Sequence, residues 1–175
     1  ELGLEIPRNI DEWETVLTAF KEKKGAKSPF SALTVDYFAS GFDATSDYYA
    51  EDGKVKFGPL DPQFKEFIVK MRDWYKKGLI DQSFTTLDGK AKETNILNGF
   101  SGATSGSVGS GIGKWMAAAK TEGFSLEGTP FPTSDLSKPA KFGVYQIQVT
   151  PTARSFDAIS TSCKDMDSAI KFLDY

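Results

Sequence analysis

The sequence contains no histidine and only one cysteine, Cys163, among its 175 residues. The absence of histidine excludes Ser-His-Asp and Cys-His nucleophile pairs, histidine-ligated zinc and a histidine general base. One thiol cannot form an internal disulfide, a thiolate zinc site or an iron–sulfur cluster. We therefore expect no metal ion and no cofactor, and we interpret Cys163 as a small, partly buried side chain.

The chain also lacks an excess of positive charge and a long apolar run. Its 21 Lys and Arg residues against 24 Asp and Glu residues give a net charge of −3. A weakly acidic chain does not supply the basic field that holds nucleic acid through its phosphates, so we expect no nucleic-acid partner. No apolar run approaches the roughly 18 residues that span a bilayer. No signal peptide is visible, although Glu1 as the first residue is compatible with a leader that has been cut away.

What the sequence does contain is a high aromatic content, with 14 Phe, 6 Tyr and 3 Trp residues. Such a composition is too apolar for a disordered segment and sufficient for a core. Apolar residues at helical spacing predict five helices, which cover residues 9–24, 61–77, 88–98, 112–121 and 165–175. Asn9 with Glu12 fits a capping box at the start of the first helix. Trp13 and Trp74 lie on apolar stripes and are predicted to be core residues.

Strand signals lie between the predicted helices. The clearest is a hairpin at residues 48–57, with Asp52 and Gly53 in its turn. Further short strands are expected at residues 30–35, 101–104, 142–150 and 158–161. Helices interleaved with strands predict the α/β fold class, a layered lobe in which helices flank a mixed sheet. The predicted last helix has no stop signal, so we expect the natural chain to continue beyond Tyr175.

The compositional anomaly is a Gly/Ser-rich segment, residues 99–113, followed by Lys114. Its spacing does not fit a phosphate-binding loop, because Val108 replaces the required glycine and Trp115 the Ser or Thr. It does not fit the dinucleotide pattern G-x-G-x-x-G either, because Gly109 and Gly111 are followed by Lys114. Small residues still let a backbone approach a ligand closely. We interpret the segment as ligand-facing, with an unstructured surface loop as the alternative. The candidate ligand-binding residues are Ser105, Ser107, Ser110 and Trp115.

A second candidate segment follows the first predicted strand. In open α/β sheets, ligands bind beyond the carboxyl ends of strands, which is where Asp36, Tyr37 and Phe38 are expected. An acid there accepts from sugar hydroxyls and an aromatic ring stacks on a sugar face, whereas the alternative is that Tyr37 and Phe38 belong to the core. Tyr145, at the exit from a proline-rich stretch, is a candidate for a ligand or hinge role.

The order of these motifs resembles the extracellular solute-binding proteins of bacterial ABC importers, the group that includes maltose-binding protein and its lipoprotein relatives. Residues 6–13 resemble the family's "P-x-T-x-D/E-W-E" helix start, and residues 52–57 resemble its hairpin. Residues 67–81 are similar to its helix ending "W-Y-x-x-G-L-I-D". Residues 96–103 look like its "F-x-x-G-x-x-A-M" step, and residues 158–175 resemble the return toward the other lobe. The likeness covers nearly the whole chain in order.

The resemblance implies a periplasmic-binding-protein-like (type II) fold, of which residues 1–175 would be a single C-terminal lobe. It also implies non-catalytic capture of an extracellular solute, most simply a carbohydrate, for an ABC permease. The implied partners are the solute, a missing N-terminal lobe and the permease, and the implied protein is a monomer, extracellular or periplasmic and lipid-anchored. The Gly/Ser segment departs from sugar-binding relatives, whose loop often carries a stacking aromatic residue. A structural cell-surface module and a glycoside-acting enzyme lobe remain alternatives.

Overall fold

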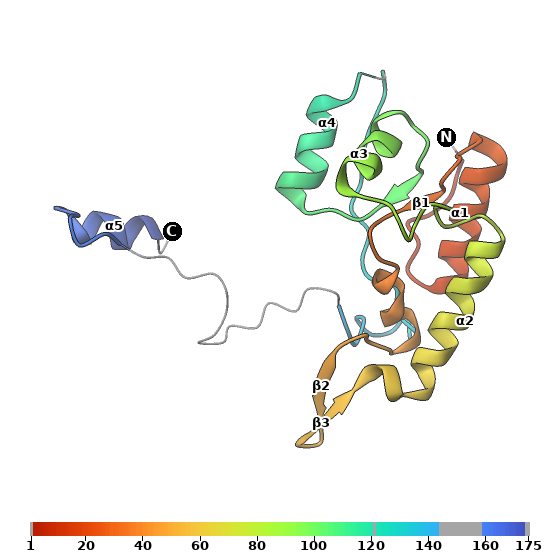
Figure 1. The fold of residues 1–175 in the computed structure, drawn as a ribbon, viewed down its shortest axis with the longest axis horizontal. Coiled ribbons are helices and arrows are strands. Elements are labelled where there is room, and N and C mark those ends of the chain that lie inside the picture. The colour runs from red at the N-terminus through yellow and green to blue at the C-terminus, as the bar shows by residue number, and fades with distance from the viewer. Residues whose placement is uncertain (1, 121, 144–158, 174–175) are drawn as a thin grey trace. The chain divides into compact units, whose positions relative to one another are not determined.

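The computed structural model describes residues 2–120, 122–143 and 159–173. The chain divides into two compact units, Glu1–Val144 and Tyr145–Tyr175, which are considered separately. The first unit combines helices with two small sheets, as the predicted α/β class requires, and the order of its elements can be followed in Figure 1. These elements are α1 (Ile10–Lys24), β1 (Phe30–Ser31), η1 (Asp36–Phe42), β2 (Tyr48–Glu51), β3 (Lys54–Phe57), η2 (Gly58–Leu60), α2 (Pro62–Lys76), α3 (Gly89–Leu97), β4 (Ala103–Thr104), η3 (Val108–Gly113) and α4 (Lys114–Ala118).

The start of α1 confirms the predicted capping box. The backbone N–H of Glu12 donates to Asn9 Oδ1 at 2.8 Å, and Asn9 Nδ2 donates back to Glu12 Oε1 at 2.9 Å. The second carboxylate oxygen of Glu12 accepts from the Arg8 N–H at 2.7 Å, one residue earlier than in the usual motif. Gly25 ends the helix as predicted, and its N–H donates to the Phe20 carbonyl. Local sequence therefore fixes both ends of α1.

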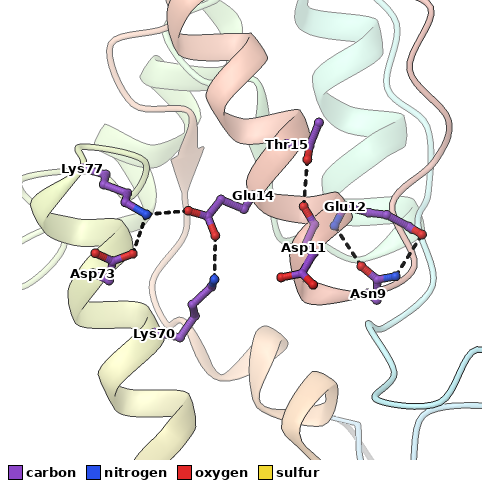
Figure 2. Close-up of polar contacts among 8 residues, drawn as sticks. All are labelled: Asn9, Asp11, Glu12, Glu14, Thr15, Lys70, Asp73 and Lys77. Carbon is purple, nitrogen blue, oxygen red and sulfur yellow. Dashed lines mark hydrogen bonds and ion pairs between the residues drawn. The ribbon is translucent and has the colours of Figure 1, made fainter.

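A network of ion pairs joins α1 to α2, which lie side by side (Figure 1). Figure 2 shows Glu14 of α1 between two lysines of α2, with Lys70 Nζ 2.6 Å from Oε2 and Lys77 Nζ 2.7 Å from Oε1. Lys77 also pairs with Asp73 at 2.7 Å. Burial alone would raise the pKa of Glu14, but the two lysines and the Trp74 indole N–H facing the carboxylate outweigh it and lower the pKa to about 2. That indole N–H lacks the geometry of a hydrogen bond to any described group.

The core of the first unit forms where α1, α2, β1 and η1 meet. Phe38 of η1 is 1% exposed and lies at its centre. Its ring makes edge-to-face contacts with Phe30, Trp74 and Trp13, at centroid separations of 4.7, 5.0 and 5.2 Å. Both tryptophans are buried, as predicted. Aromatic rings of this size contribute both buried area and preferred edge-to-face geometry, so this cluster fixes how η1 sits on the two helices.

The sheet that organises the first unit is small and parallel. β1 pairs with β4 in parallel register, Phe30 opposite Ala103 and Ser31 opposite Thr104. A parallel bridge from Phe30 to Ile80 adds a third extended segment on the other side of β1. The predicted strand at residues 30–35 is shorter than expected, because the chain turns into η1 after Ser31. The carboxyl ends of all three segments therefore lie at one edge.

The predicted hairpin is confirmed as the antiparallel pair β2–β3, a sheet of its own, so the mixed sheet is split into two. Asp52 and Gly53 form its turn with φ angles of 52° and 72°, the left-handed pair that a two-residue hairpin turn requires. The side that carries Tyr48, Val55 and Phe57 is exposed. The other side is covered, because the Tyr49 ring packs edge-to-face on Phe142 and Glu51 pairs with Lys56 and Lys141. The hairpin thus turns its apolar side outward.

The remaining helices differ in part from prediction. α3 forms at the expected place, with Asp88 as its cap. The helix expected over 112–121 begins earlier, as the π-helical turn η3, and α4 ends at Ala118. None of the helices in the described part of the chain is long and apolar enough to cross a membrane.

The second unit contains α5 (Met166–Leu173), close to the predicted last helix. The Asp165 carboxylate caps it by accepting from the Ser168 N–H at 3.0 Å. The strand expected at 158–161 is wrong for its described residues, because 159–161 form an irregular segment that enters a turn. The strand expected at 142–150 lies outside the described residues except for 142 and 143, which are not in a strand. That residues 1–175 form one lobe stays a prediction.

Candidate functional site

The parallel pairing of β1 and β4 brings the two predicted ligand segments to one edge of the sheet. Ser105 directly follows β4, and Asp36 begins η1 five residues after the end of β1. Because adjacent parallel strands end at the same edge, both segments leave the sheet there. Residues after Ile80 leave at this edge too, since Ile80 bridges to Phe30 in parallel. This edge is the candidate functional site.

Asp36 and Tyr37 are both half-buried at the start of η1. One Asp36 carboxylate oxygen accepts a hydrogen bond from Ser46 Oγ at 3.2 Å. The Tyr37 ring lies parallel to that of Phe131, with 6.4 Å between centroids and 6° between planes. Phe131, which comes from the segment after α4 and is 38% exposed, was not anticipated from the sequence. The acid and the aromatic pair therefore form a mixed polar and apolar surface beside η1.

Phe38 does not belong to this surface, which corrects its assignment as a ligand-binding residue. Its ring is 1% exposed and enclosed by Trp13, Phe30 and Trp74, so a solute cannot reach it without opening the core. The alternative core interpretation is the right one for this residue. The reason is the period of η1, a 3₁₀ helix in which consecutive side chains point in different directions.

The Gly/Ser segment is ordered by its contacts with Trp115, not by a phosphate-type loop. Trp115 of α4 is 5% exposed. A Cβ placed on Gly106 would lie 2.7 Å from Trp115 Cη2, and one on Gly111 would lie 3.3 Å from Cζ3. Only glycine lets the backbone approach the ring this closely. The assignment of Trp115 as a ligand-binding residue is therefore corrected, because its ring is buried against the backbone of the segment.

Ser105 is half-buried and Ser107 is exposed. Neither hydroxyl forms a hydrogen bond with another group in the described part of the chain. The Ser107 carbonyl accepts from the N–H groups of Gly111 and Ile112, which closes the first turn of η3. The side chain of Ser110 and all of Tyr145 lie outside the described residues. Two of the predicted serines thus stand at the sheet edge with hydroxyls available to a ligand.

Lys92 of α3 reaches the same edge and was missed by the sequence analysis. Its Nζ donates to the Ser105 carbonyl at 2.9 Å. The same ammonium lies 5.2 Å from the centroid of the Trp115 ring, within the range of a cation–π contact. Burial lowers the pKa of Lys92, against an opposing effect of Glu93. A lysine in a helical sequence gives no signal that it will fold back over a tryptophan 23 positions later, so only the structure reveals it.

A buried carboxylate, Asp81, stands just beyond Ile80 at this edge and was also missed. Asp81 is 4% exposed, and its Oδ2 accepts from Ser31 Oγ at 2.8 Å and Asn95 Nδ2 at 2.9 Å. Its Oδ1 accepts from the backbone N–H and the hydroxyl of Ser83, at 2.9 and 2.6 Å. Burial alone would raise the pKa of Asp81, but the hydrogen bonds from Ser83 and Ser31 outweigh it, and the pKa lies below its ordinary value. Asp81 is therefore an anion that links β1 to α3 and to the turn that follows Ile80.

Two other sequence expectations can be placed. Cys163 is half-buried, as expected, and its thiol lies 3.4 Å from the Asp165 carbonyl oxygen. Within the part of the chain that the structure describes, no three potential metal ligands from His, Cys, Asp or Glu gather in a group. The polar side chains at the sheet edge are thus a lysine, hydroxyls and single carboxylates, which can donate and accept hydrogen bonds.

No protein-family model and no curated protein matches the chain. Among solved structures, part of the chain is similar to the alginate-binding protein AlgQ2, crystallised without calcium ion. The two share 33% sequence identity over 57% of this chain and 23% of that one, with a TM-score of 0.49. The chain thus spans about a quarter of the length of that protein.

Proposed function

We propose that this chain is one lobe of a non-catalytic solute-binding protein, which captures a carbohydrate outside the cell for delivery to an ABC permease. The proposal rests on one observation above the rest. The parallel β1–β4 pair sends the Asp36–Tyr37 segment and the Ser105–Ser107 segment from the same sheet edge. A carboxylate, free hydroxyls and an aromatic pair at one edge are the groups that hydrogen-bond and stack with sugar rings.

In the proposed mechanism the edge of this lobe faces a second lobe, and the solute lies between them. The solute favours the closed arrangement because only that arrangement lets it contact both lobes at once. The closed form then presents one continuous surface to the permease. No covalent bond is made or broken. The full-length protein acts as a monomer, and a lipid anchor holds it at the outer side of the membrane.

A glycoside-acting lobe is less well supported by the charges at this edge. Glycoside hydrolysis uses a pair of carboxyl groups, one of which must keep its proton at neutral pH and so needs a raised pKa. Asp81 has the opposite property, because its pKa is lowered and its oxygens already accept four hydrogen bonds. Asp36 alone cannot supply both roles.

The proposal can be tested by following the backbone amides of the ¹⁵N-labelled chain by NMR during titration with oligosaccharides. A single lobe supplies half of the contacts, so we expect weak binding that needs millimolar saccharide. The expected shifts fall on residues 36–37 and 105–107 and on the Trp115 indole N–H. Chemical shifts confined to the β2–β3 hairpin, or no shifts with any saccharide tested, would contradict the proposal.

A matched pair of variants sharpens this test. Ser107→Ala removes an exposed hydroxyl at the proposed site and adds no bulk. Ser137→Ala removes another exposed hydroxyl, which donates to Asp135 Oδ1 at 2.6 Å in the segment that follows α4. We expect the first variant to weaken saccharide binding and the second to leave it unchanged. Equal effects of the two would show that the hydroxyls act through stability alone.

A further inference from the structure

We propose that Lys92 gives this site a preference for anionic solutes, namely saccharides that carry a carboxylate. The inference rests on the proposed function, since it names the class of solute that the same sheet edge would bind. It is drawn from the position of one ammonium group, which the solute-capture hypothesis by itself does not require.

The ammonium of Lys92 lies at the carboxyl edge of the parallel sheet. Lys92 lies on the second turn of α3. Its Nζ donates to the carbonyl oxygen of Ser105, which is the first residue after β4. This hydrogen bond places the charge at the carboxyl edge of the parallel sheet. The Trp115 ring lies on one side of the ammonium, 5.2 Å away at its centroid. The charge is thus held in place where the Gly/Ser segment leaves β4.

The ammonium of Lys92 has no carboxylate partner among the described residues. A lysine ammonium has three N–H donors, and the Ser105 carbonyl accepts one of them. No carboxylate of the described residues forms an ion pair with Lys92. The nearest acid along the helix, Glu93, is paired with Lys114 at 2.6 Å, so its charge is already compensated. A half-buried cation with two donors left over is electrostatically ready for an anion.

Lys92 differs in burial and pairing from the other lysines on its helix and nearby. Lys90 is exposed, and Lys114 is neutralised by Glu93. Burial lowers the pKa of Lys92, as expected for a cation whose hydration has been partly removed without a matching anion. An acidic ligand would restore that lost solvation. A neutral ligand could accept a hydrogen bond there but would leave the charge uncompensated.

The test compares charged and neutral forms of the same sugar. The probes are trimers of galacturonate, mannuronate and glucuronate, each beside its methyl ester, which keeps the ring and removes the charge. We expect the free acids to bind the chain about tenfold more tightly than the esters, because both forms can accept a hydrogen bond from the ammonium but only the carboxylate compensates its charge. A sugar phosphate probes whether the site accepts any anion or a carboxylate in particular, since lysine serves both as a point charge.

Variants assign the effect to the residue. Lys92→Met keeps the apolar stem over Trp115 and removes the charge, so it should abolish the preference for the acids, while the esters lose at most the one hydrogen bond that they accept from the ammonium. Lys90→Met, on the same helix, should behave as the parent chain. Urea unfolding confirms that both variants remain folded under the titration conditions, and Lys92→Arg should retain the preference for the acids.

The outcomes separate this inference from the function on which it rests. Equal affinity for acids and esters, or a preference that survives in Lys92→Met, overturns the role of Lys92 and leaves solute capture standing. Binding of no saccharide in either form removes both. Acid binding that shifts only amides outside residues 36–37, 105–107, Trp115 and α3 would show a different anion site and also overturns the inference.

Discussion

Two regions of the first unit are held together in opposite ways. Around Phe38, four aromatic rings from α1, β1, η1 and α2 close on one another, and none of them exceeds 8% exposure. After β4, a run of glycine and serine packs on the single ring of Trp115, and its polar groups are half-buried or exposed and only partly paired. The first region is complete without a ligand. The second leaves hydroxyls and a cation available.

The contrast indicates a division of labour along the sheet. A closed aromatic core gives a rigid base, because its rings cannot move without losing edge-to-face contacts and buried area. A backbone of small residues can approach a ligand closely, and its hydroxyls can reorient at little cost. Asp81 lies between the two, buried like the core but polar like the edge. Three sets of variants, from the largest expected effect to the smallest, test whether the two regions differ as described.

The strongest test removes the centre of the closed region. Phe38→Ala leaves a cavity among three aromatic rings, and we expect the free energy of unfolding to fall by about 4 kcal/mol. Urea denaturation followed by tryptophan fluorescence measures this, because Trp13 and Trp74 contact the deleted ring. Leu33→Ala, at a neighbouring position that is 51% exposed, serves as the control and should cost less than about 1 kcal/mol. Similar losses in the two variants would mean that Phe38 is not central to the core.

The next test addresses the buried anion that joins core and edge. Asp81→Asn keeps the shape of the side chain but turns an amide N–H₂ toward donors that need an acceptor. We expect a loss of about 3 kcal/mol at pH 7, since Asp81 accepts four hydrogen bonds in a buried site. Asp52→Asn, in the exposed hairpin turn, is the control and should change stability by less than about 0.5 kcal/mol.

The pH dependence of the same pair gives the sign of the effect. In the folded chain the pKa of Asp81 lies below its ordinary value of 3.8. Acidification therefore protonates the unfolded state first and favours unfolding. The stabilisation by Asp81 is complete above the unfolded pKa and is lost as the pH falls through the folded pKa. The gap between the parent chain and Asp81→Asn should narrow below pH 3.8, and a gap that widens there would contradict the assignment.

The sequence predicted the parts of the molecule that are set by neighbours along the chain. Asn9 and Glu12, three positions apart, cap α1, and Asp52 with Gly53 forms the turn of the β2–β3 hairpin. The common edge of the two ligand segments was not predicted, because it depends on the parallel pairing of β1 with the distant β4. Phe38 was ambiguous, because a single aromatic residue after a short strand has no period from which to assign its side. Only packing against distant Trp74 decides it.

Lys92 and Asp81 escaped for a related reason. The bonds that give them meaning span long stretches of sequence, from Asp81 back to Ser31 and from Lys92 forward to Ser105. Neither residue type is unusual where it stands. A lysine on a helix is normally a solvated charge, and an acid after a buried strand is normally a turn residue. Their burial, which sets them apart, is a property of the folded chain alone.

The smallest predicted effect distinguishes the glycines that the open region needs from those it tolerates. A Cβ on Gly106 would meet the Trp115 ring at 2.7 Å, so Gly106→Ala should push the ring or the backbone aside and cost about 1–2 kcal/mol. Gly109, three residues on in η3, has nothing within 4 Å of the same added atom. Gly109→Ala should instead raise the free energy of unfolding by about 0.5 kcal/mol, because it restricts the unfolded chain at no steric cost. Thermal unfolding of the two variants side by side measures the difference. If both alanines were neutral, the segment would not rest on Trp115, and the hydroxyls above it would lack the fixed support that solute capture requires.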